Sequence, residues 1–268
     1  MSNTGRIRVG IGGWNYEPWR ETFYPPQIGK KDELDYASRK VTAIEINSTF
    51  YRLQKAEVFA RWRDATPDEF MFSVKAPRFI AQRKALADAG PHVQRFLDSG
   101  VTELGRKLGP ILWQLEPKHV FDADDLRAFL ELLPPDVGSL QLRHALEVRH
   151  ASFACEEFLS IARARNVSVV LEDDETYPGF ADATGDFIYA RLRRSVTTEV
   201  TGYPPAEIDR WAQRACLWAR GDEPDDLPRV EKISSAAKGK PRDVFIYFIN
   251  GAKERAPAAA MALIDRLR

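Results

Sequence analysis

Cysteine and histidine are scarce in this chain of 268 residues, which has two of the first and four of the second. Cys155 and Cys216 are too few for a disulfide framework or for a metal site built from cysteines. Isolated cysteines are typical of a reducing compartment, and the polar residues 1–8 show no signal-peptide pattern. We therefore expect a cytoplasmic protein.

Net charge is also lacking, because 39 basic residues balance 39 acidic ones. A protein that coats nucleic acid needs a broad basic surface, so the balance argues against that class and leaves only a local basic cleft open. No apolar run approaches the roughly 18 residues that span a bilayer. The sequence also lacks GxGxxG after its first strand-like run, as well as GxxxxGK[ST], HExxH and GxSxG. The missing glycine motifs weaken the alternative of a nucleotide-binding open sheet, and a nucleophile-elbow hydrolase has no support.

What the chain does have is a regular alternation of short apolar runs with amphipathic segments. Enrichment in β-branched and aromatic residues, with flanking Gly and Pro, predicts eight strands, at 6–13, 41–48, 70–76, 111–115, the later half of 140–148, 167–172, 187–193 and 244–250. Helices are expected in most gaps, with Asp122 and Ser152 as caps of two of them, Pro204-Pro205 starting a third and 255–267 forming the last. This pattern predicts an α/β fold, a single (β/α)₈ barrel of eight parallel strands over 1–268. The polar stretch 221–240 is expected to be a surface excursion before the last strand.

Polar side chains are expected to gather at the C-terminal end of this barrel. Successive strand residues point alternately into the lumen and toward the helices. With Ile44 and Ile46 facing the helices, Glu45 faces the lumen; in the last strand we expect Phe248 to take the lumen phase. The resulting ring consists of Glu45, Asn47, Lys75, Gln114, Glu147, Arg149, Glu172, Arg191 and Asn250.

This ring indicates an active site, since barrel enzymes place their chemistry at that face and burying many charges is costly. The alternative is a structural network of salt bridges that plugs the barrel. In the functional interpretation, Glu45 and Glu147 are acid/base candidates, and Lys75 supplies an electrophilic contact or tunes Glu45. Arg149 and Arg191 would clamp a carboxylate or phosphate, because a guanidinium fork matches those groups.

The remaining candidates would contact or orient a ligand. Asn47, Gln114 and Asn250 are polar groups of the ring, and Glu172 belongs with them as a substrate-binding residue. Trp14 and Tyr51 come from two aromatic-rich loops and could stack on a base or a sugar, although such residues also commonly pack in a core.

Histidine and metal chemistry have little support in the sequence. His150 follows the fifth strand and could act as a general acid or base, or equally as a hydrogen-bonded structural residue. The carboxylates of the ring could hold a hard cation such as Mg²⁺, but Lys75, Arg149 and Arg191 in the same ring would already neutralise them. We therefore expect no metal and no other cofactor.

Several motifs in this order resemble the "domain of unknown function 72" family, also called YecE-like. They are GGW (12–14), FYP (23–25), EINSTFY (45–51), FSVKAP (72–77), LGP (108–110), QL (114–115) and EVRH (147–150). The resemblance runs from about Val9 to the C-terminus and implies a TIM-type barrel, but it implies no particular activity. The family's seventh strand usually reads RLHG, whereas Arg193 stands here in place of that histidine. The change removes a possible proton shuttle and favours anion binding.

The leading hypothesis is an enzyme of hydrolase or isomerase type that acts on a small phosphate- or carboxylate-bearing molecule at the C-terminal mouth. One alternative is nucleic-acid binding, with Arg191, Arg193 and Arg194 on phosphates and aromatic side chains on bases. The other is a non-catalytic ligand-binding scaffold, which predicts that the charges of the ring pair with one another. No membrane association is expected, and the sequence leaves the oligomeric state open.

Overall fold

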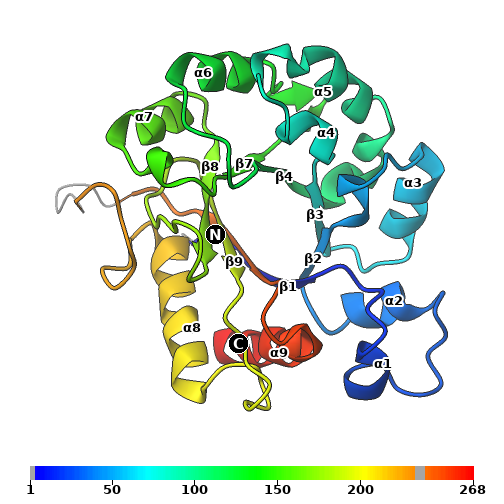
Figure 1. The fold of residues 1–268 in the computed structure, drawn as a ribbon. Helices are drawn as coiled ribbons and strands as arrows, with labels where there is room; N and C mark the ends of the chain where they lie inside the picture. The colour runs from blue at the N-terminus through cyan, green and yellow to red at the C-terminus, as the bar shows by residue number, and fades with distance from the viewer. Residues whose placement is uncertain (1–3, 233–238) are drawn as a thin grey trace.

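A computed structural model describes residues 4–232 and 239–268. Eight parallel strands close into a barrel in the order β1-β10-β9-β8-β7-β4-β3-β2 (Figure 1). The strands are β1 (Ile7–Gly12), β2 (Ala43–Ile46), β3 (Met71–Lys75), β4 (Leu108–Gln114), β7 (His144–Glu147), β8 (Ser168–Asp173), β9 (Phe187–Leu192) and β10 (Asp243–Phe248). The predicted single (β/α)₈ barrel is therefore confirmed, with each strand inside or close to its predicted range.

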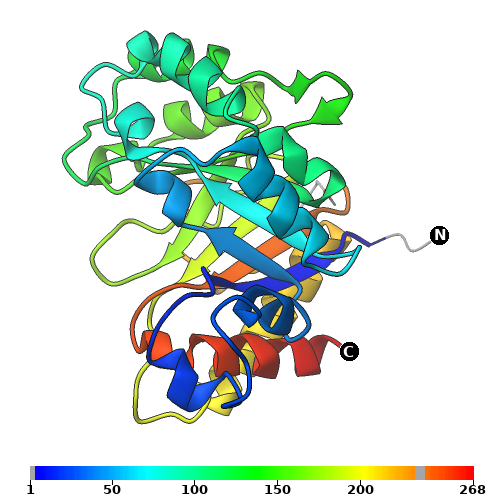
Figure 2. The same ribbon diagram turned by 90° about the vertical axis from the view of Figure 1, so that its right-hand side faces the viewer.

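Helices surround the barrel on its outside. Figure 2 shows the blue strand β1 beginning at one end of the barrel, and Figure 1 looks onto the opposite end, where the carboxyl ends of the strands lie. The α-helices are α1 (Trp19–Thr22), α2 (Glu33–Ser38), α3 (Ala56–Asp64), α4 (Arg78–Ala81), α5 (Gly90–Leu97), α6 (Ala123–Glu131), α7 (Glu156–Ala164), α8 (Pro205–Arg220) and α9 (Ala256–Leu267). Short 3₁₀ helices are η1 (Ser48–Phe50), η2 (Ala87–Ala89), η3 (Val101–Lys107), η4 (Ala151–Phe153) and η5 (Lys253–Arg255). Along the parts of the chain covered by the structure, no helix has both the length and the apolar character needed to cross a bilayer.

Two apolar cores follow from the alternation of side chains along the strands. The larger lies between strands and helices and contains Ile44 and Ile46, as predicted. The smaller fills the lumen and consists of Ala43, Leu112, Ala145, Val170, Phe187, Tyr189, Phe245, Tyr247 and Ile249. The phase predicted for the last strand is wrong, because Phe248 belongs to the helix-side core and Tyr247 faces the lumen.

The helix starts follow local hydrogen bonding. Asp122 caps α6 as predicted, since its side chain accepts from the backbone N–H groups of Asp124 and Asp125, both at 3.0 Å. Ser152 is not the predicted cap: it lies within η4, and α7 begins only after Cys155. The start of α8 at Pro205 agrees with the paired prolines, since proline at a first helical position leaves no N–H unsatisfied.

Two connections depart from simple βα repetition. The loop between β8 and β9, residues 174–186, contains no helix. Before the barrel's fifth strand, β5 (Asp136–Val137) and β6 (Leu140–Gln141) form a small antiparallel hairpin, and the later half of the run 140–148 joins the barrel, as predicted. Of the predicted excursion 221–240, residues 233–238 lie outside the described part. In the rest, Val230 and Glu231 donate backbone hydrogen bonds to the Asp182 carboxylate at 2.9 and 3.0 Å.

Candidate functional site

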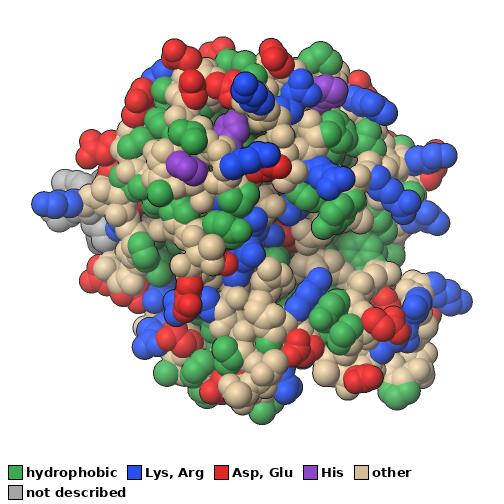
Figure 3. Space-filling view, viewed as in Figure 1, with side chains coloured by type: hydrophobic (Ala, Val, Ile, Leu, Met, Phe, Trp, Pro, Cys, Tyr) green, Lys and Arg blue, Asp and Glu red, His purple; other side chains and the backbone are tan. Residues whose placement is uncertain are grey.

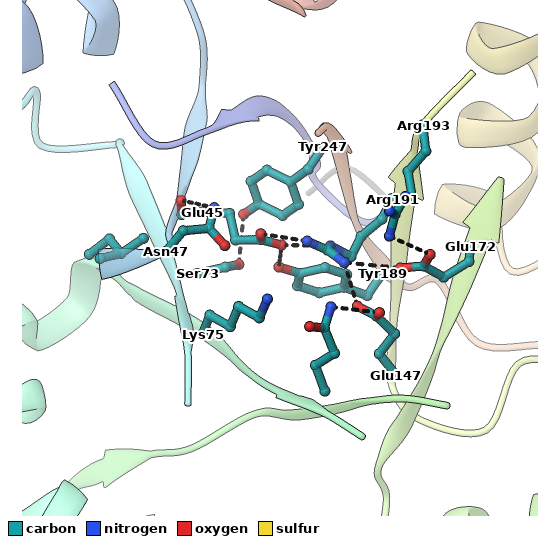
Figure 4. Close-up of polar contacts among 12 residues, drawn as sticks. Glu45, Asn47, Ser73, Lys75, Glu147, Glu172, Tyr189, Arg191, Arg193 and Tyr247 are labelled. Atoms are coloured by element: carbon teal, nitrogen blue, oxygen red, sulfur yellow. Dashed lines mark hydrogen bonds and ion pairs between the residues drawn. The ribbon is translucent and has the colours of Figure 1, made fainter. Parts of the chain in front are cut away.

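Arg191 is the centre of a buried cluster of carboxylates at the C-terminal mouth (Figure 4). Its side chain is 2% exposed. Nε and Nη2 donate to the two oxygens of Glu45, each at 3.1 Å. Nη1 donates to Glu147 at 2.5 Å and to Glu172 at 2.9 Å. Four of the five guanidinium N–H groups are thus used within the protein, so Arg191 is not free to clamp a ligand in the way that its strand position suggested.

The barrel brings these side chains together because they end neighbouring or facing strands in the lumen phase. Glu172 pairs with Arg191 in the register of β8 and β9, and Gln114 pairs with Glu147 in that of β4 and β7. Glu45 reaches the same point from β2 across the lumen. Gln114 donates to Glu147 at 2.6 Å and so helps to fix that carboxylate.

Glu147 and Glu172 share this cluster but differ in acidity. Burial opposes ionisation of Glu147, yet the charges of Arg191 and then Arg149 outweigh it and lower the pKa of that carboxyl. For Glu172, burial and the negative charge of Glu147 raise the pKa, and Arg191 only partly offsets this. The pair therefore combines an ionised carboxylate with a carboxyl group that holds a proton more readily, which is the arrangement that acid/base chemistry requires.

Lys75 lies beside this cluster, in contact with an aromatic ring but with none of the carboxylates. Its side chain points toward the centre of the mouth, and no dashed line reaches it in Figure 4. Within the described residues it makes no hydrogen bond or ion pair, and its Nζ lies 3.9 Å from the centroid of the Phe50 ring. Burial and the charge of Arg191 lower the pKa of Lys75 from 10.5 to about 8, against the opposing charges of Glu147 and Glu45.

Two further arginines lie nearer the rim and flank the ring of Tyr177, from the loop after β8. The guanidinium carbon of Arg149 lies 4.5 Å from the ring centroid, and that of Arg193 lies 5.7 Å from it. Arg149 Nε donates to Glu147 at 2.6 Å, while its two Nη atoms have no acceptor in the described structure. Arg193 contacts Glu172 at 3.1 Å and Asp174 at 2.9 Å. Arg149 is therefore the guanidinium at the mouth with the most free donors.

The other predicted residues lie around this centre rather than in it. Asn47 is half-buried and donates to the backbone oxygen of Glu45 at 3.3 Å. Asn250 is exposed. When its amide is oriented so that both polar atoms have partners, its side-chain oxygen accepts a hydrogen bond from Arg193 Nη2 at 3.0 Å. Its position at the rim, outside the lumen, follows from the corrected phase of β10.

The predicted aromatic contacts divide between packing and exposure. The Trp14 ring packs edge-on against Trp62, with centroids 5.2 Å apart, and is half-buried. Tyr51 is 70% exposed, with the Arg78 guanidinium 6.0 Å from its ring centroid. Only Tyr51 of the two predicted contacts is thus open to a ligand over most of its surface.

His150 has a structural partner. Its Nδ1 accepts from the backbone N–H of Ser152 at 3.2 Å and lies 2.8 Å from the Ser152 hydroxyl. The His150 side chain thereby caps η4. With Nδ1 accepting the Ser152 N–H, the ring proton lies on Nε2. This contact supports the interpretation of His150 as a hydrogen-bonded structural residue.

Several residues of the site were missed by the sequence interpretation. Tyr247 faces the lumen, and its hydroxyl lies 2.6 Å from that of Ser73; the correct phase for β10 would have found it. Lys253 lies in η5 with its Nζ 4.6 Å from the Tyr16 ring centroid, and burial lowers the pKa of its amine. Neither Lys253 nor Tyr177 lies on a strand, so alternation gave no signal for them.

The C-terminal face carries cations at its centre but no continuous basic groove. Figure 3 shows basic side chains reaching the middle of this face, with acidic and apolar ones around them. A hollow of about 1320 Å³ beside α4 is lined by three basic and four acidic residues, Arg83, Lys84, Lys118, Asp88, Glu116, Asp122 and Asp125. A second, of about 1060 Å³ between the β8–β9 loop and α8, is lined by four basic and five acidic residues, Arg194, Arg210, Arg214, Arg229, Glu172, Asp173, Asp174, Glu207 and Asp226.

The donor set of the mouth does not resemble a metal centre. Across the described residues, no group of three or more His, Cys, Asp or Glu side chains is arranged to hold a metal ion. The three carboxylates that come closest to such a set, those of Glu45, Glu147 and Glu172, all surround the guanidinium of Arg191. The guanidinium takes the place between these oxygens that a cation would need.

Solved structures of two similar proteins have the same fold. The DUF72 family protein of Thermotoga maritima superposes with a TM-score of 0.74 at 19% identity, over 98% of this chain and 99% of that one. The DUF72 family protein of Enterococcus faecalis gives a TM-score of 0.71 at 16% identity, over 97% and 95% of the two chains. At such identities the likeness establishes the fold alone.

Sequence comparison identifies the family. UPF0759 protein YecE of Escherichia coli K12 is 31% identical over 150 residues, 55% of this chain and 50% of that protein. UPF0759 protein YunF of Bacillus subtilis 168 is 31% identical over 157 residues, 57% and 54% of the two. These matches span about half the length of either relative. The model of the family described as "Protein of unknown function DUF72" matches residues 8–268. The resemblance seen in the motifs is therefore confirmed, and the chain belongs to the DUF72 family.

Proposed function

We propose that the protein is an enzyme acting on a small anionic molecule, with a phosphate or carboxylate group, at the C-terminal mouth of the barrel. The observation that carries the proposal is the contrast between Arg191, which donates to three carboxylates, and two other cations of the mouth. Arg191 is enclosed by three carboxylates, whereas among the described residues Lys75 has no hydrogen-bond or ion-pair partner and neither Nη atom of Arg149 has an acceptor. Cationic donors that lack a protein acceptor and are largely shielded from solvent are suited to an anionic ligand.

The charge balance supports the same conclusion. Four carboxylates of the mouth, Glu45, Glu147, Glu172 and Asp174, face four cations, Lys75, Arg149, Arg191 and Arg193. The raised pKa of Glu172 means that this carboxyl is partly protonated near neutrality, which leaves an excess of positive charge. The excess lies at Lys75 and Arg149, where an incoming anion would bind.

The chemistry that these groups support is proton transfer. Glu172 would act as the proton donor, and Lys75 would touch the substrate as an electrophile or as a proton-transfer group. The charges of Glu147 and Glu45, both held by Arg191, would partly oppose the lowering of the Lys75 pKa by burial and by Arg191. Both a proton-transfer isomerisation and a hydrolysis fit this set.

The two thiols, Cys155 and Cys216, are unpaired, which supports a reducing, cytoplasmic location.

The test is anion binding measured by thermal melting and calorimetry with inorganic phosphate and malonate. Arg149→Met and Lys75→Met should each weaken binding about ten- to hundredfold, the scale of a charged hydrogen bond of about 1.5–3 kcal/mol. Arg163→Met, which removes an ion pair with Glu231 away from the mouth, is the matched control and should bind like wild type. Equal responses from wild type and both mouth variants would refute the proposed site.

A second candidate, nucleic-acid binding, is favoured by the exposed Tyr51 with Arg78 beside its ring. Against it, acidic residues outnumber basic ones in both large hollows of the C-terminal face. This candidate predicts binding of single-stranded oligonucleotides that weakens steeply with salt and is lost in Tyr51→Ala.

The scaffold alternative predicts that all charges of the mouth pair with one another. The enclosure of Arg191 fits that prediction, but the unpaired Lys75 does not. A scaffold would also bind anions without turnover, so activity screening after binding is established separates it from the enzyme.

A further inference from the structure

We propose that Lys75 is a covalent residue, which forms an imine with an aldehyde or ketone group of the anionic substrate. This inference rests on the proposed function, because it uses the same mouth and deepens it by naming the substrate class: a small carbonyl compound that also carries a phosphate or carboxylate, such as a 2-oxo acid or a sugar phosphate.

The first argument is the freedom of the amine. A lysine ammonium normally finds water or a carboxylate, and here three carboxylates lie in the same cluster. All three instead bind Arg191, and none of them binds Lys75. Nζ is also absent from the fully enclosed side-chain atoms that lack a partner, so solvent and a small ligand can reach it.

The second argument is the positioning of the side chain. Lys75 is the last residue of β3 and is only 8% exposed. Its backbone oxygen accepts a hydrogen bond from the Thr49 hydroxyl at 2.7 Å, which ties β3 to the 3₁₀ helix after β2. The same helix supplies Phe50, whose ring lies under Nζ. The amine is thus held at one place by packing instead of by an ion pair, and it keeps its lone pair available once it is deprotonated.

The third argument is the charge around the amine. Arg191 on β9 and Arg149 after β7 disfavour a second cation, whereas Glu147 on β7 and Glu45 on β2 favour it. Together with burial, these groups bring the pKa of Lys75 to about 8. A substantial fraction of the amine is then neutral near physiological pH, as nucleophilic attack requires.

The step balances without any redox partner. The neutral amine attacks the carbonyl carbon, a C–N bond forms, and the carbonyl electron pair moves to oxygen. A proton passes from nitrogen to that oxygen, giving a carbinolamine. The oxygen takes a second proton from an acid such as Glu172 and leaves as water, while the nitrogen lone pair forms the C=N bond of a cationic imine. Arg149, with free Nη donors, would hold the phosphate or carboxylate of the same molecule.

The experiment traps the imine on wild-type protein with two probes, pyruvate and pyridoxal 5′-phosphate, followed by borohydride reduction and peptide mass mapping. We expect reduced adduct on Lys75 at least about tenfold above that on the exposed Lys118, because an amine of lower pKa is more often neutral. Inorganic phosphate should suppress labelling of Lys75 and leave labelling of Lys118 unchanged. Lys75→Arg keeps the positive charge and should lose only the mouth adduct.

The outcomes separate this inference from the proposed function. Labelling of Lys75 no higher than that of Lys118, in a protein whose melting still responds to phosphate, would overturn the imine and leave anion binding intact. Absence of both the adduct and the phosphate response would overturn both. Because the adduct is mapped on wild type, the result does not depend on the folding of a variant. Labelling at Lys253 in place of Lys75 would also overturn the assignment.

Discussion

Replacing Arg191 with Met should destabilise the protein strongly and in a pH-dependent way. Three carboxylates with 0% side-chain exposure surround this guanidinium, and a methionine of similar length leaves them without their shared cation. Removing one partner of a buried ion pair costs about 3–5 kcal/mol, because the remaining charge is uncompensated. Repulsion among three carboxylates places Arg191→Met in the upper part of that range near pH 8.

The sign of the pH dependence follows from proton binding. In wild type, the pKa of Glu147 is lowered, so the stability that it contributes is present above its unfolded pKa and is lost only in acid. Without Arg191, burial should raise the pKa of these carboxyls above their unfolded values. The folded variant then takes up protons as the pH falls toward about 6, and each proton bound recovers about 1.4 kcal/mol per pH unit. The stability gap between wild type and variant should therefore narrow in mild acid.

The assay is urea unfolding followed by fluorescence of the six tryptophans, at about pH 8 and about pH 6. Arg163→Met is the control: it removes a 2.8 Å ion pair with Glu231 that is more than a quarter exposed on both sides, and it should cost no more than about 1 kcal/mol at either pH. A loss below about 1 kcal/mol for Arg191→Met, or a gap that does not change with pH, would refute the view of Arg191 as the cation that holds the carboxylates together.

Two further predictions concern Lys75 and the lumen. The folded pKa of Lys75 is about 8, below its usual 10.5, so between these values the unfolded chain binds one proton more than the folded protein. The free energy of unfolding of wild type should therefore rise, relative to that of Lys75→Met, by up to about 1.4 kcal/mol per pH unit as the pH rises through about 8–10. A constant difference in urea titrations would show that the amine titrates normally. Tyr247→Phe leaves the buried Ser73 hydroxyl without its 2.6 Å partner and should cost about 1–3 kcal/mol, whereas adding Ser73→Ala should cost little more. Additive losses in that double-mutant cycle would contradict coupling across the lumen.

The architecture could be predicted from the sequence because its signals are local. Period-two alternation and flanking Gly and Pro place each strand, and a capping carboxylate such as that of Asp122 begins a helix without help from distant residues. The same alternation placed Glu45, Lys75, Glu147 and Arg191 at one mouth. It failed at β10, where aromatic and aliphatic residues occupy both phases, so that hydrophobicity could not distinguish the lumen from the helix side.

The sequence by itself therefore determined the barrel, its strand ends and the family, since these depend on pattern and on motifs within single segments. Only the tertiary structure decided which cation each carboxylate binds. Arg191, Arg149 and Lys75 have equivalent positions in the pattern. In the described structure, however, carboxylates enclose Arg191, Arg149 donates through Nε alone, and Lys75 has no ion-pair partner. Those differences arise from distances of a few ångströms between strands far apart in the chain, and electrostatic energy in a buried site depends steeply on such distances.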